Sequence, residues 1–341
     1  MQHLSIPACY FPSTALFIDD SRDFLLNFVL QLDEGLAYRI FDSPFDALDF
    51  LEKKRCQLET LNHRCTTEFE EIKASHSTDL GINNSLAAIH AEIYNQKRFT
   101  EVSVIVVDYA MPGMNGLEFC RRLANTNIKK ILLTGKADEK LAIQAFNEGL
   151  IHRYIHKSDP QAAELITKSI SDLQQQYFQA MSDNLVRMLN IPVPHCLHDA
   201  KFSYFFRQFC KEKGIVEHYL ADYSGSFMLL DDDANVSFLI TKTLADLEAH
   251  FSLARRNGAN ESVLEELARG LKIPCYWQRN EVIPEWNDWF SCLVPAQRLE
   301  ADHTYFYSYV SGPLLFDVDQ DKLQSYHQYL EEIDAEELLL L

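Results

Sequence analysis

The stretch VIVVDYAMPGMNG, residues 104–116, decides the fold. It begins with four consecutive β-branched residues and ends its apolar run at a single carboxylate, Asp108. An unbroken apolar run predicts a strand that is buried on both faces, as in a parallel sheet, and such sheets bind ligands beyond the carboxyl ends of their strands. Pro112 and Gly113 then predict a loop before an amphipathic helix. Asp108 is therefore a candidate site residue.

A second strand of the same kind ends at two more carboxylates. The run from Ala15 to Ile18 leads directly into Asp19 and Asp20. If this strand neighbours the one before Asp108, three like charges converge, and such a cluster needs a cation or raised pKa values. Oxygen ligands with room for water suit Mg²⁺. The alternative is that Asp19 and Asp20 only cap the helix that follows, as acids at helix N-termini often do.

Two further predicted strands lead to a hydroxyl and an ammonium group. Thr134 follows the apolar residues 131–133, and Lys157 lies three residues beyond Tyr154. A carboxylate nucleophile, a Mg²⁺ site, a hydroxyl donor and a lysine are the groups needed to accept a phosphoryl group, because catalysis there consists of positioning and charge neutralisation. The four strand ends therefore favour phosphoryl transfer.

Residues 14–178 contain Asp-Asp, Asp, Thr and Lys in this order at the ends of successive predicted strands. In this arrangement they resemble the receiver domain of bacterial two-component response regulators. The resemblance implies a flavodoxin-like fold, which is a doubly wound parallel α/β sheet, and a sensor histidine kinase or phosphotransfer protein as partner. It also implies that Asp108 is the phosphoacceptor. The cofactor would be Mg²⁺, held by Asp20, Asp108 and the Ala110 carbonyl directly and by Asp19 through water.

The same resemblance assigns the other strand-end residues. Thr134 and Tyr154 become the switch pair, in which the hydroxyl turns toward the phosphoryl group and the ring follows, and Lys157 binds a phosphoryl oxygen. Ser158 departs from the family, which usually has a proline there, commonly after a cis bond. Because a cis bond before a non-proline residue costs about 3 kcal/mol more than a trans bond, the geometry of this loop stays open.

The 341 residues are enough for a second core. The connection between Lys54 and the strand at Val104 is far longer than the usual few residues and has helix-like spacing, which predicts a helical hairpin that protrudes from the receiver. The expected organisation is a receiver domain at 1–159 with a helical insertion at about 56–100, a long connector helix at 160–191 and a C-terminal α+β output domain at 195–341.

The predicted connector helix carries an apolar stripe that extends beyond the length of a receiver's last helix. Such a stripe favours pairing with a second copy, so we expect a homodimer; the alternative is packing on the chain's own output domain. The stripe consists of Ile166, Ile170, Leu173, Tyr177, Met181, Leu185 and Met188.

The output region starts with a predicted β-hairpin whose turn lies at Asp231 to Asn235. We interpret the acids of this turn as turn chemistry and not as a metal site. The aromatic residues further on either line a ligand pocket or pack in the core, and core packing is the more frequent role. The remaining predicted elements are helices at 243–258 and 261–271, aromatic strands at 275–278 and 303–310, and a terminal helix at 321–341; the aromatic residues include Trp277, Trp286, Trp289 and the Tyr305–Tyr309 cluster.

Charge argues against DNA binding by this region. From His195 onward there are 12 Lys and Arg against 25 Asp and Glu, and the isoelectric point of the chain is about 5.0. A DNA-binding domain needs a basic footprint for phosphates. We expect a protein-interaction output; a nucleotide- or small-molecule-binding enzyme is the alternative, and a DNA-binding transcription factor is less favoured. Residues 219–310 are similar to the uncharacterised output module of a small group of proteobacterial response regulators. The whole chain resembles a quorum-sensing response regulator, which implies a quorum-sensing pathway.

No segment reaches the roughly 18 uninterrupted apolar residues of a transmembrane helix, and the N-terminus lacks a basic region followed by an apolar core. We expect a cytoplasmic protein without membrane insertion. The eight cysteines form no CxxC pair, so reduced and mostly buried thiols are expected in place of a zinc site or redox motif. They are Cys9, Cys56, Cys65, Cys120, Cys196, Cys210, Cys275 and Cys292.

Overall fold

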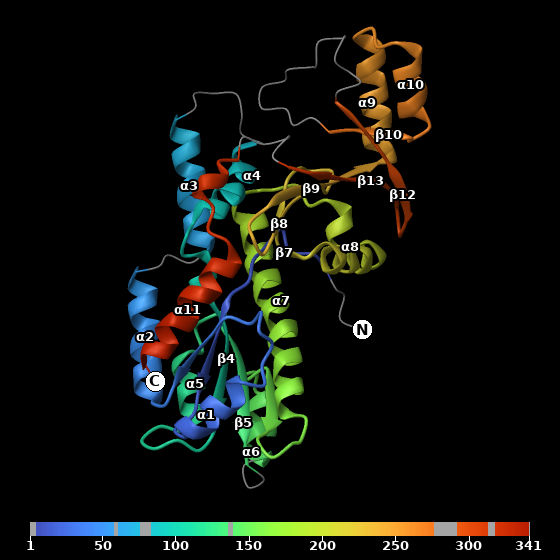
Figure 1. The fold of residues 1–341 in the computed structure, drawn as a ribbon. Helices are drawn as coiled ribbons and strands as arrows, with labels where there is room; N and C mark the ends of the chain where they lie inside the picture. The colour runs from blue at the N-terminus through green and yellow to red at the C-terminus, as the bar shows by residue number, and fades with distance from the viewer. Residues whose placement is uncertain are drawn as a thin grey trace. The chain divides into compact units, whose positions relative to one another are not determined.

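Packing divides the chain into two units, each with its own sheet (Figure 1). The parallel-sheet unit consists of residues 11–64, 96–181 and 326–341, and the antiparallel-sheet unit of residues 1–10, 65–95 and 182–325. The computed structural model describes residues 5–57, 61–75, 83–135, 139–275, 292–312 and 318–340. No helix in these ranges is long and apolar enough to cross a membrane.

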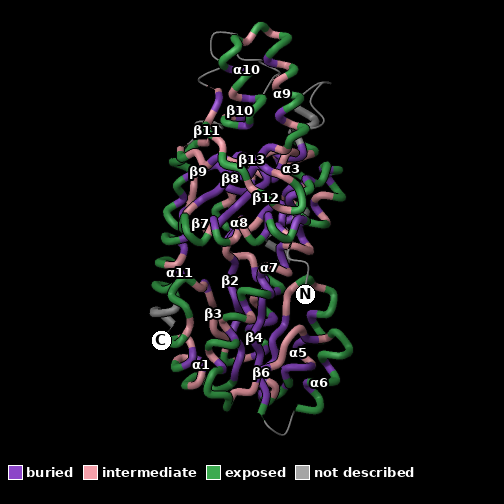
Figure 2. The backbone as a smooth tube through the Cα atoms, turned by 90° about the vertical axis from the view of Figure 1, so that its right-hand side faces the viewer, coloured by how far each residue is buried: buried purple, intermediate pink, exposed green. Residues whose placement is uncertain are grey.

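The first unit contains five parallel strands in the order β3-β2-β4-β5-β6. This order confirms the doubly wound α/β sheet expected from the sequence. Strands β2 and β4 are buried along their whole length, as Figure 2 shows, because both faces are covered by helices. The strands are β2 (Thr14–Ile18), β3 (Tyr38–Phe41), β4 (Val102–Asp108), β5 (Lys129–Thr134) and β6 (Arg153–His156).

Helices cover both faces of this sheet. Alternate residues of β4 point to opposite faces, so Ile105 and Val107 join one core and Val104 and Val106 the other. The first core is completed by α2 (Pro44–Gln57), α5 (Gly116–Arg122) and α6 (Glu139–Asn147), and the second by α1 (Arg22–Val29) and α7 (Ala162–Met188).

The apolar stripe of the connector helix, now α7, is buried within a single chain. Ile166, Ile170 and Leu173 pack in the second core of the parallel sheet, and the Tyr177 hydroxyl donates to Glu101 Oε1 over 2.5 Å. Met181 and Leu185 are also buried, and Met188 is exposed. The expectation that this stripe is a contact surface between two copies is therefore wrong for its six buried residues, because their side chains already fill the interior. A homodimer through another surface stays a prediction.

The terminal helix α11 (Tyr326–Leu340) belongs to the parallel-sheet unit, which differs from the expected output domain at 195–341. The Tyr326 hydroxyl donates to the Gly35 carbonyl over 2.7 Å and accepts from the Ala37 N–H over 3.0 Å. Tyr329 shares a buried 2.7 Å hydrogen bond with Thr14, the first residue of β2. These bonds fix α11 beside strands β2 and β3.

The second unit is built on an antiparallel sheet in the order β1-β7-β8-β9-β13-β12. The predicted hairpin is confirmed as β8 and β9. Asp231 Oδ1 accepts from the N–H groups of Asp233 and Asn235, so this acid stabilises the turn. The strands are β1 (Cys9–Tyr10), β7 (Ile215–Leu220), β8 (Phe227–Asp231), β9 (Val236–Thr243), β12 (Gln297–Glu300) and β13 (Thr304–Ser311), and a separate pair is formed by β10 (Lys272–Pro274) and β11 (Leu293–Pro295).

The described part of the aromatic cluster packs against one helix of this unit, with Tyr305 in the core and Tyr307 and Tyr309 only partly buried. Helix α8 (Ala200–Lys213) presents phenylalanines at helical spacing to alternate tyrosines of β13. The ring centroids of Phe202 and Tyr305 lie 4.9 Å apart, and two further Phe–Tyr pairs, Phe205 with Tyr307 and Phe209 with Tyr309, repeat the contact along the strand at 4.6 and 5.4 Å. Trp277, Trp286 and Trp289 lie outside the described residues, as does most of the strand expected at 275–278.

Four further helical elements complete this unit or lead into it. The sequence predicts that the helices before the central strand β4 form a protruding hairpin. In the structure, residues 65–95 instead pack with the antiparallel sheet. Ser85 donates to the Leu189 carbonyl and the His90 ring contacts the Leu220 carbonyl, both at 2.8 Å. The elements are α3 (Leu61–Ser75), α4 (Asn83–His90), α9 (Leu244–Arg256) and α10 (Glu261–Ala268).

Candidate functional site

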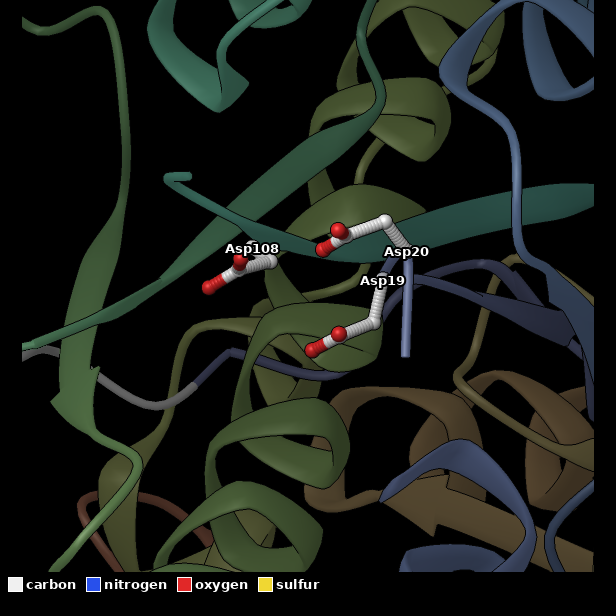
Figure 3. Close-up of side chains that lie close together, drawn as sticks. All are labelled: Asp19, Asp20 and Asp108. Atoms are coloured by element: carbon white, nitrogen blue, oxygen red, sulfur yellow. The ribbon is translucent and has the colours of Figure 1, made fainter. Parts of the chain in front are cut away.

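Three carboxylates meet at the carboxyl ends of β2 and β4. The two strands are parallel neighbours, with Ile18 opposite Val107, so the residues that follow them lie side by side. Asp19 and Asp108 are buried, Asp20 is exposed, and one oxygen of each lies within 4.8 Å of the others. Figure 3 shows Asp19 and Asp20 beyond β2 and Asp108 at the end of β4. The convergence expected from the sequence is therefore present.

Local hydrogen bonds fix these carboxylates. Asp19 Oδ1 accepts from the Ser21 N–H over 3.0 Å, and Asp108 Oδ2 accepts from the Ala110 N–H over 3.1 Å. The N-cap of α1 is Ser21, whose hydroxyl oxygen accepts from the Phe24 N–H. The alternative in which Asp19 and Asp20 serve only as helix caps therefore fails, because another residue fills that role.

Lys157 connects the two buried carboxylates. Its Nζ lies 2.5 Å from Asp19 Oδ2 and 2.8 Å from Asp108 Oδ1. The described residues contain no cis peptide bond, so the Lys157–Ser158 bond is trans. The missing proline therefore does not prevent this lysine from reaching the site.

Burial and charge compete at this site. Burial raises the pKa of Asp19 and outweighs the hydrogen bond from Lys157, which lowers it. Burial alone would lower the pKa of Lys157, but its hydrogen bonds to Asp108 and Asp19 raise it overall. Three carboxylates against one ammonium group leave an excess of negative charge, and the exposed Asp20 leaves room for water. This donor set of oxygen atoms fits Mg²⁺.

The expected switch residues lie on the next two strands. Thr134, the last residue of β5, is fully buried, and its hydroxyl lies 3.4 Å from Nδ1 of His156. Tyr154 on β6 is partly buried, and its ring meets the edge of Phe146 from α6. The sequence reasoning missed His156. Its position next to Lys157 is visible in the sequence, but its pairing with Thr134 depends on the strand register.

Comparison with known proteins agrees with this geometry. A family model described as a response regulator receiver domain matches residues 72–170, a range that contains Asp108, Thr134 and Lys157 but neither Asp19 nor Asp20. The long connection between β3 and β4 explains the late start, because it separates the first acids from the rest of the pattern. Fold and site together define a response regulator with a receiver domain.

A solved structure of the Legionella pneumophila response regulator LqsR is 63% identical to this chain, with 100% of both chains covered and a TM-score of 0.87. The chain therefore belongs to the response regulator family that includes LqsR. The cyclic di-GMP phosphodiesterase response regulator RpfG of Xanthomonas campestris is 34% identical over 79 residues, which are 22% of this chain and 21% of that protein. The chain thus matches only about a fifth of that relative.

Proposed function

We propose that Asp108 accepts a phosphoryl group in a Mg²⁺-dependent reaction from a sensor histidine kinase or phosphotransfer protein. The observation that carries this proposal is the contact of Lys157 with both Asp19 and Asp108 at the edge of three converging carboxylates. A lysine in that position can transfer its ion pair from the carboxylate to an oxygen of the incoming phosphoryl group.

Each residue of the proposed site has a separate role that follows from its position. Asp20 and Asp108, with the Ala110 carbonyl, would hold the cation directly, and Asp19 would hold it through water. Bound Mg²⁺ neutralises the charge that gathers on the phosphoryl oxygens. A carboxylate oxygen of Asp108 attacks the phosphorus, the bond from phosphorus to the donor's histidine nitrogen breaks, and Lys157 binds a phosphoryl oxygen.

Phosphorylation of Asp108 would change the structure of the neighbouring strands β5 and β6. The Thr134 hydroxyl leaves His156 and donates to the phosphoryl group, and the Tyr154 ring follows into the space beside β5. This movement changes the surface of β6 and α6, on which a partner can distinguish the two states. We further propose that the antiparallel-sheet unit is a protein-interaction output, that the protein self-associates, and that its pathway is quorum sensing.

A second candidate function for the output is small-molecule binding. A cavity of about 610 Å³ lies between α8 and β13, walled by the rings of Phe205, Tyr307 and Tyr309 and by the charged side chains of Glu212 and Lys213. Aromatic walls with a few polar groups are typical of ligand pockets. Direct DNA binding remains disfavoured by the acidic composition of this region.

Phosphorylation by a small-molecule donor tests the central proposal. The full chain is incubated with phosphoramidate or acetyl phosphate, with and without Mg²⁺, and its modified fraction is measured by phosphate-affinity gels. We expect modification that requires Mg²⁺ and is removed by hydroxylamine, and none in Asp108→Asn. Asp23→Asn, in the first turn of α1, is the matched control that removes a neighbouring acid and should react normally. Hydroxylamine-resistant modification that persists in Asp108→Asn contradicts the assignment.

A further inference from the structure

Two cysteines face each other at the end of the short β10–β11 pair in the antiparallel-sheet unit. The register places Lys272 opposite Pro295 and Pro274 opposite Leu293, so the next pair along is Cys275 with Cys292. The backbone N–H of Cys275 donates to the Cys292 carbonyl over 2.8 Å, which shows that the ladder continues to this pair. The Cys275 thiol lies 3.2 Å from the same carbonyl oxygen.

This arrangement suits a cross-strand disulfide. Directly opposite residues of an antiparallel ladder point to the same face, and the Cα atoms of a hydrogen-bonded pair are about 5.5 Å apart. Disulfides span Cα separations of roughly 4.4–6.8 Å. Both thiols are reduced and partly exposed, so a small oxidant can reach them. Among the other described cysteines, Cys9, Cys65, Cys120 and Cys196 are buried.

We propose that Cys275 and Cys292 are a modification site, at which glutathione disulfide or a similar small disulfide oxidises them reversibly to an intramolecular disulfide. The sequence gives no signal for this pair, because the residues are not in a CxxC motif and only the strand register brings them together. The proposal concerns the antiparallel-sheet unit and does not depend on the function of Asp108.

The burial of the Cys275 thiol sets the order of the two thiol–disulfide exchange steps. Burial raises the pKa of the Cys275 thiol to about 11, which makes it a poor first nucleophile. The Cys292 thiol loses its proton and attacks glutathione disulfide, forming a mixed disulfide and releasing one glutathione. The Cys275 thiol then loses its proton and attacks the Cys292 sulfur, releasing the second glutathione. Two thiols are oxidised to one disulfide, and one glutathione disulfide is reduced to two thiols.

The link would reinforce a weak part of this unit. Strands β10 and β11 pair over only three residues each. Leu293 of β11 packs with Ala254 of α9 and with Val263, Leu264 and Leu267 of α10. A covalent bond across the two strands would restrict the unfolded ensemble of the chain between them and hold β11 against these helices. Oxidation should therefore raise the resistance of this region to proteolysis.

Peptide mapping of the full-length protein tests the proposal. The protein is incubated with glutathione disulfide, alkylated with iodoacetamide and digested with trypsin, which places Cys275 in peptide 273–279 and Cys292 in peptide 280–298. We expect these two peptides to appear as one linked species, two hydrogens lighter than their sum and separated by dithiothreitol. Cys275→Ser should instead retain glutathione on Cys292, because the second thiol is missing.

Two controls keep the result specific. Cys210→Ser, which removes another partly exposed thiol of the same unit, should leave the linked species unchanged. The native protein should form the link at least ten times faster than the same protein in concentrated urea, because folding holds the thiols together. Equal rates in both conditions, glutathione that stays on Cys292 in the unmutated protein, or a link between two chains on non-reducing gels would each overturn the proposal.

Discussion

Gly116 is the residue on which the backbone at Asp108, the proposed phosphoacceptor, depends. A Cβ atom at this position would lie 2.3 Å from the Asp108 carbonyl oxygen and 2.9 Å from Leu132 Cδ1. The Gly116 N–H also donates to the Tyr109 carbonyl, so the two segments cannot separate without losing a hydrogen bond. The glycine is needed for the close approach of two backbones, and not for an unusual backbone angle.

We therefore expect Gly116→Ala to lower the free energy of unfolding by about 2 kcal/mol, because the new methyl group displaces the Asp108 backbone. Phosphorylation by phosphoramidate should slow in parallel. Urea unfolding and phosphate-affinity gels measure the two effects. Gly149→Ala is the control: it has open space around it and a positive φ of 71°, so it should cost about 1 kcal/mol of strain and leave phosphorylation unchanged. Unimpaired phosphorylation of Gly116→Ala would contradict the argument.

His156 holds Thr134 in its present position by a long hydrogen bond. A bond of this kind contributes at most about 1 kcal/mol, which corresponds to less than tenfold in an equilibrium. His156→Val should free the Thr134 hydroxyl and tighten the binding of beryllofluoride, a phosphoryl mimic, by severalfold in calorimetry. The double variant with Thr134→Val should bind no better than Thr134→Val alone. Weaker binding by His156→Val would assign this histidine a supporting role.

The site residues illustrate which positions a sequence reveals. Asp19, Asp108 and Lys157 could be found because each follows an apolar strand, and the carboxyl ends of parallel strands share one edge. His156 could not be found in this way. Its contact with Thr134 requires that residues 134 and 156 pair across β5 and β6, and an apolar pattern does not fix that register.

At the scale of an element, helix α7 shows how an apolar stripe can be assigned to the wrong partner. Its spacing correctly predicts one long helix with a covered face, but the pattern does not say what covers it. The same holds for α11, whose Tyr329 hydroxyl is hydrogen-bonded to Thr14 of β2 although the helix follows residues of the antiparallel-sheet unit in the chain. Long-range packing of this kind has no local signal in the sequence.

The burial of α7 gives a direct prediction. Leu173 is fully buried between α7 and the parallel sheet, so Leu173→Ala should lower the free energy of unfolding by about 3 kcal/mol through lost contacts and a cavity. Leu165 on the same helix is 39% exposed, and Leu165→Ala should change stability by less than about 1 kcal/mol. Chemical unfolding of both variants measures the difference. Similar small losses would mean that the stripe is not core.

At the scale of the whole molecule, buried histidines predict a stability that falls with acidification. His218 lies between the rings of Tyr10, Phe206 and Phe227, and one ring nitrogen contacts the Pro7 carbonyl. Burial lowers its pKa from the ordinary 6.5 to about 3, and the Pro7 contact offsets only part of this. As the pH falls below 6.5, the unfolded chain takes up a proton that the folded chain does not, so the folded state loses stability.

The buried His218 should cost up to about 1.4 kcal/mol per pH unit below 6.5, or about 2 kcal/mol at pH 5. Burial also lowers the pKa of His152 and of His250 to about 4, so they add to the same trend. Urea unfolding at pH 7, 6 and 5 measures the slope. His218→Phe should flatten it, whereas His327→Phe, at an exposed position of α11, should not. An identical slope in both variants would refute this account.

Neither unit is a continuous stretch of chain, and this has a consequence for inheritance. Residues 65–95 leave the parallel-sheet unit for the antiparallel one, the chain returns for residues 96–181, leaves again, and comes back at residue 326 to add α11. A single recombination within the coding sequence therefore cannot transfer either unit whole. A recombination at a single point inside the chain would leave a helix or a pair of β-strands without the surface that covers it. Transfer of either unit as a whole would need several separate exchanges, one at each point where the chain crosses from one unit to the other.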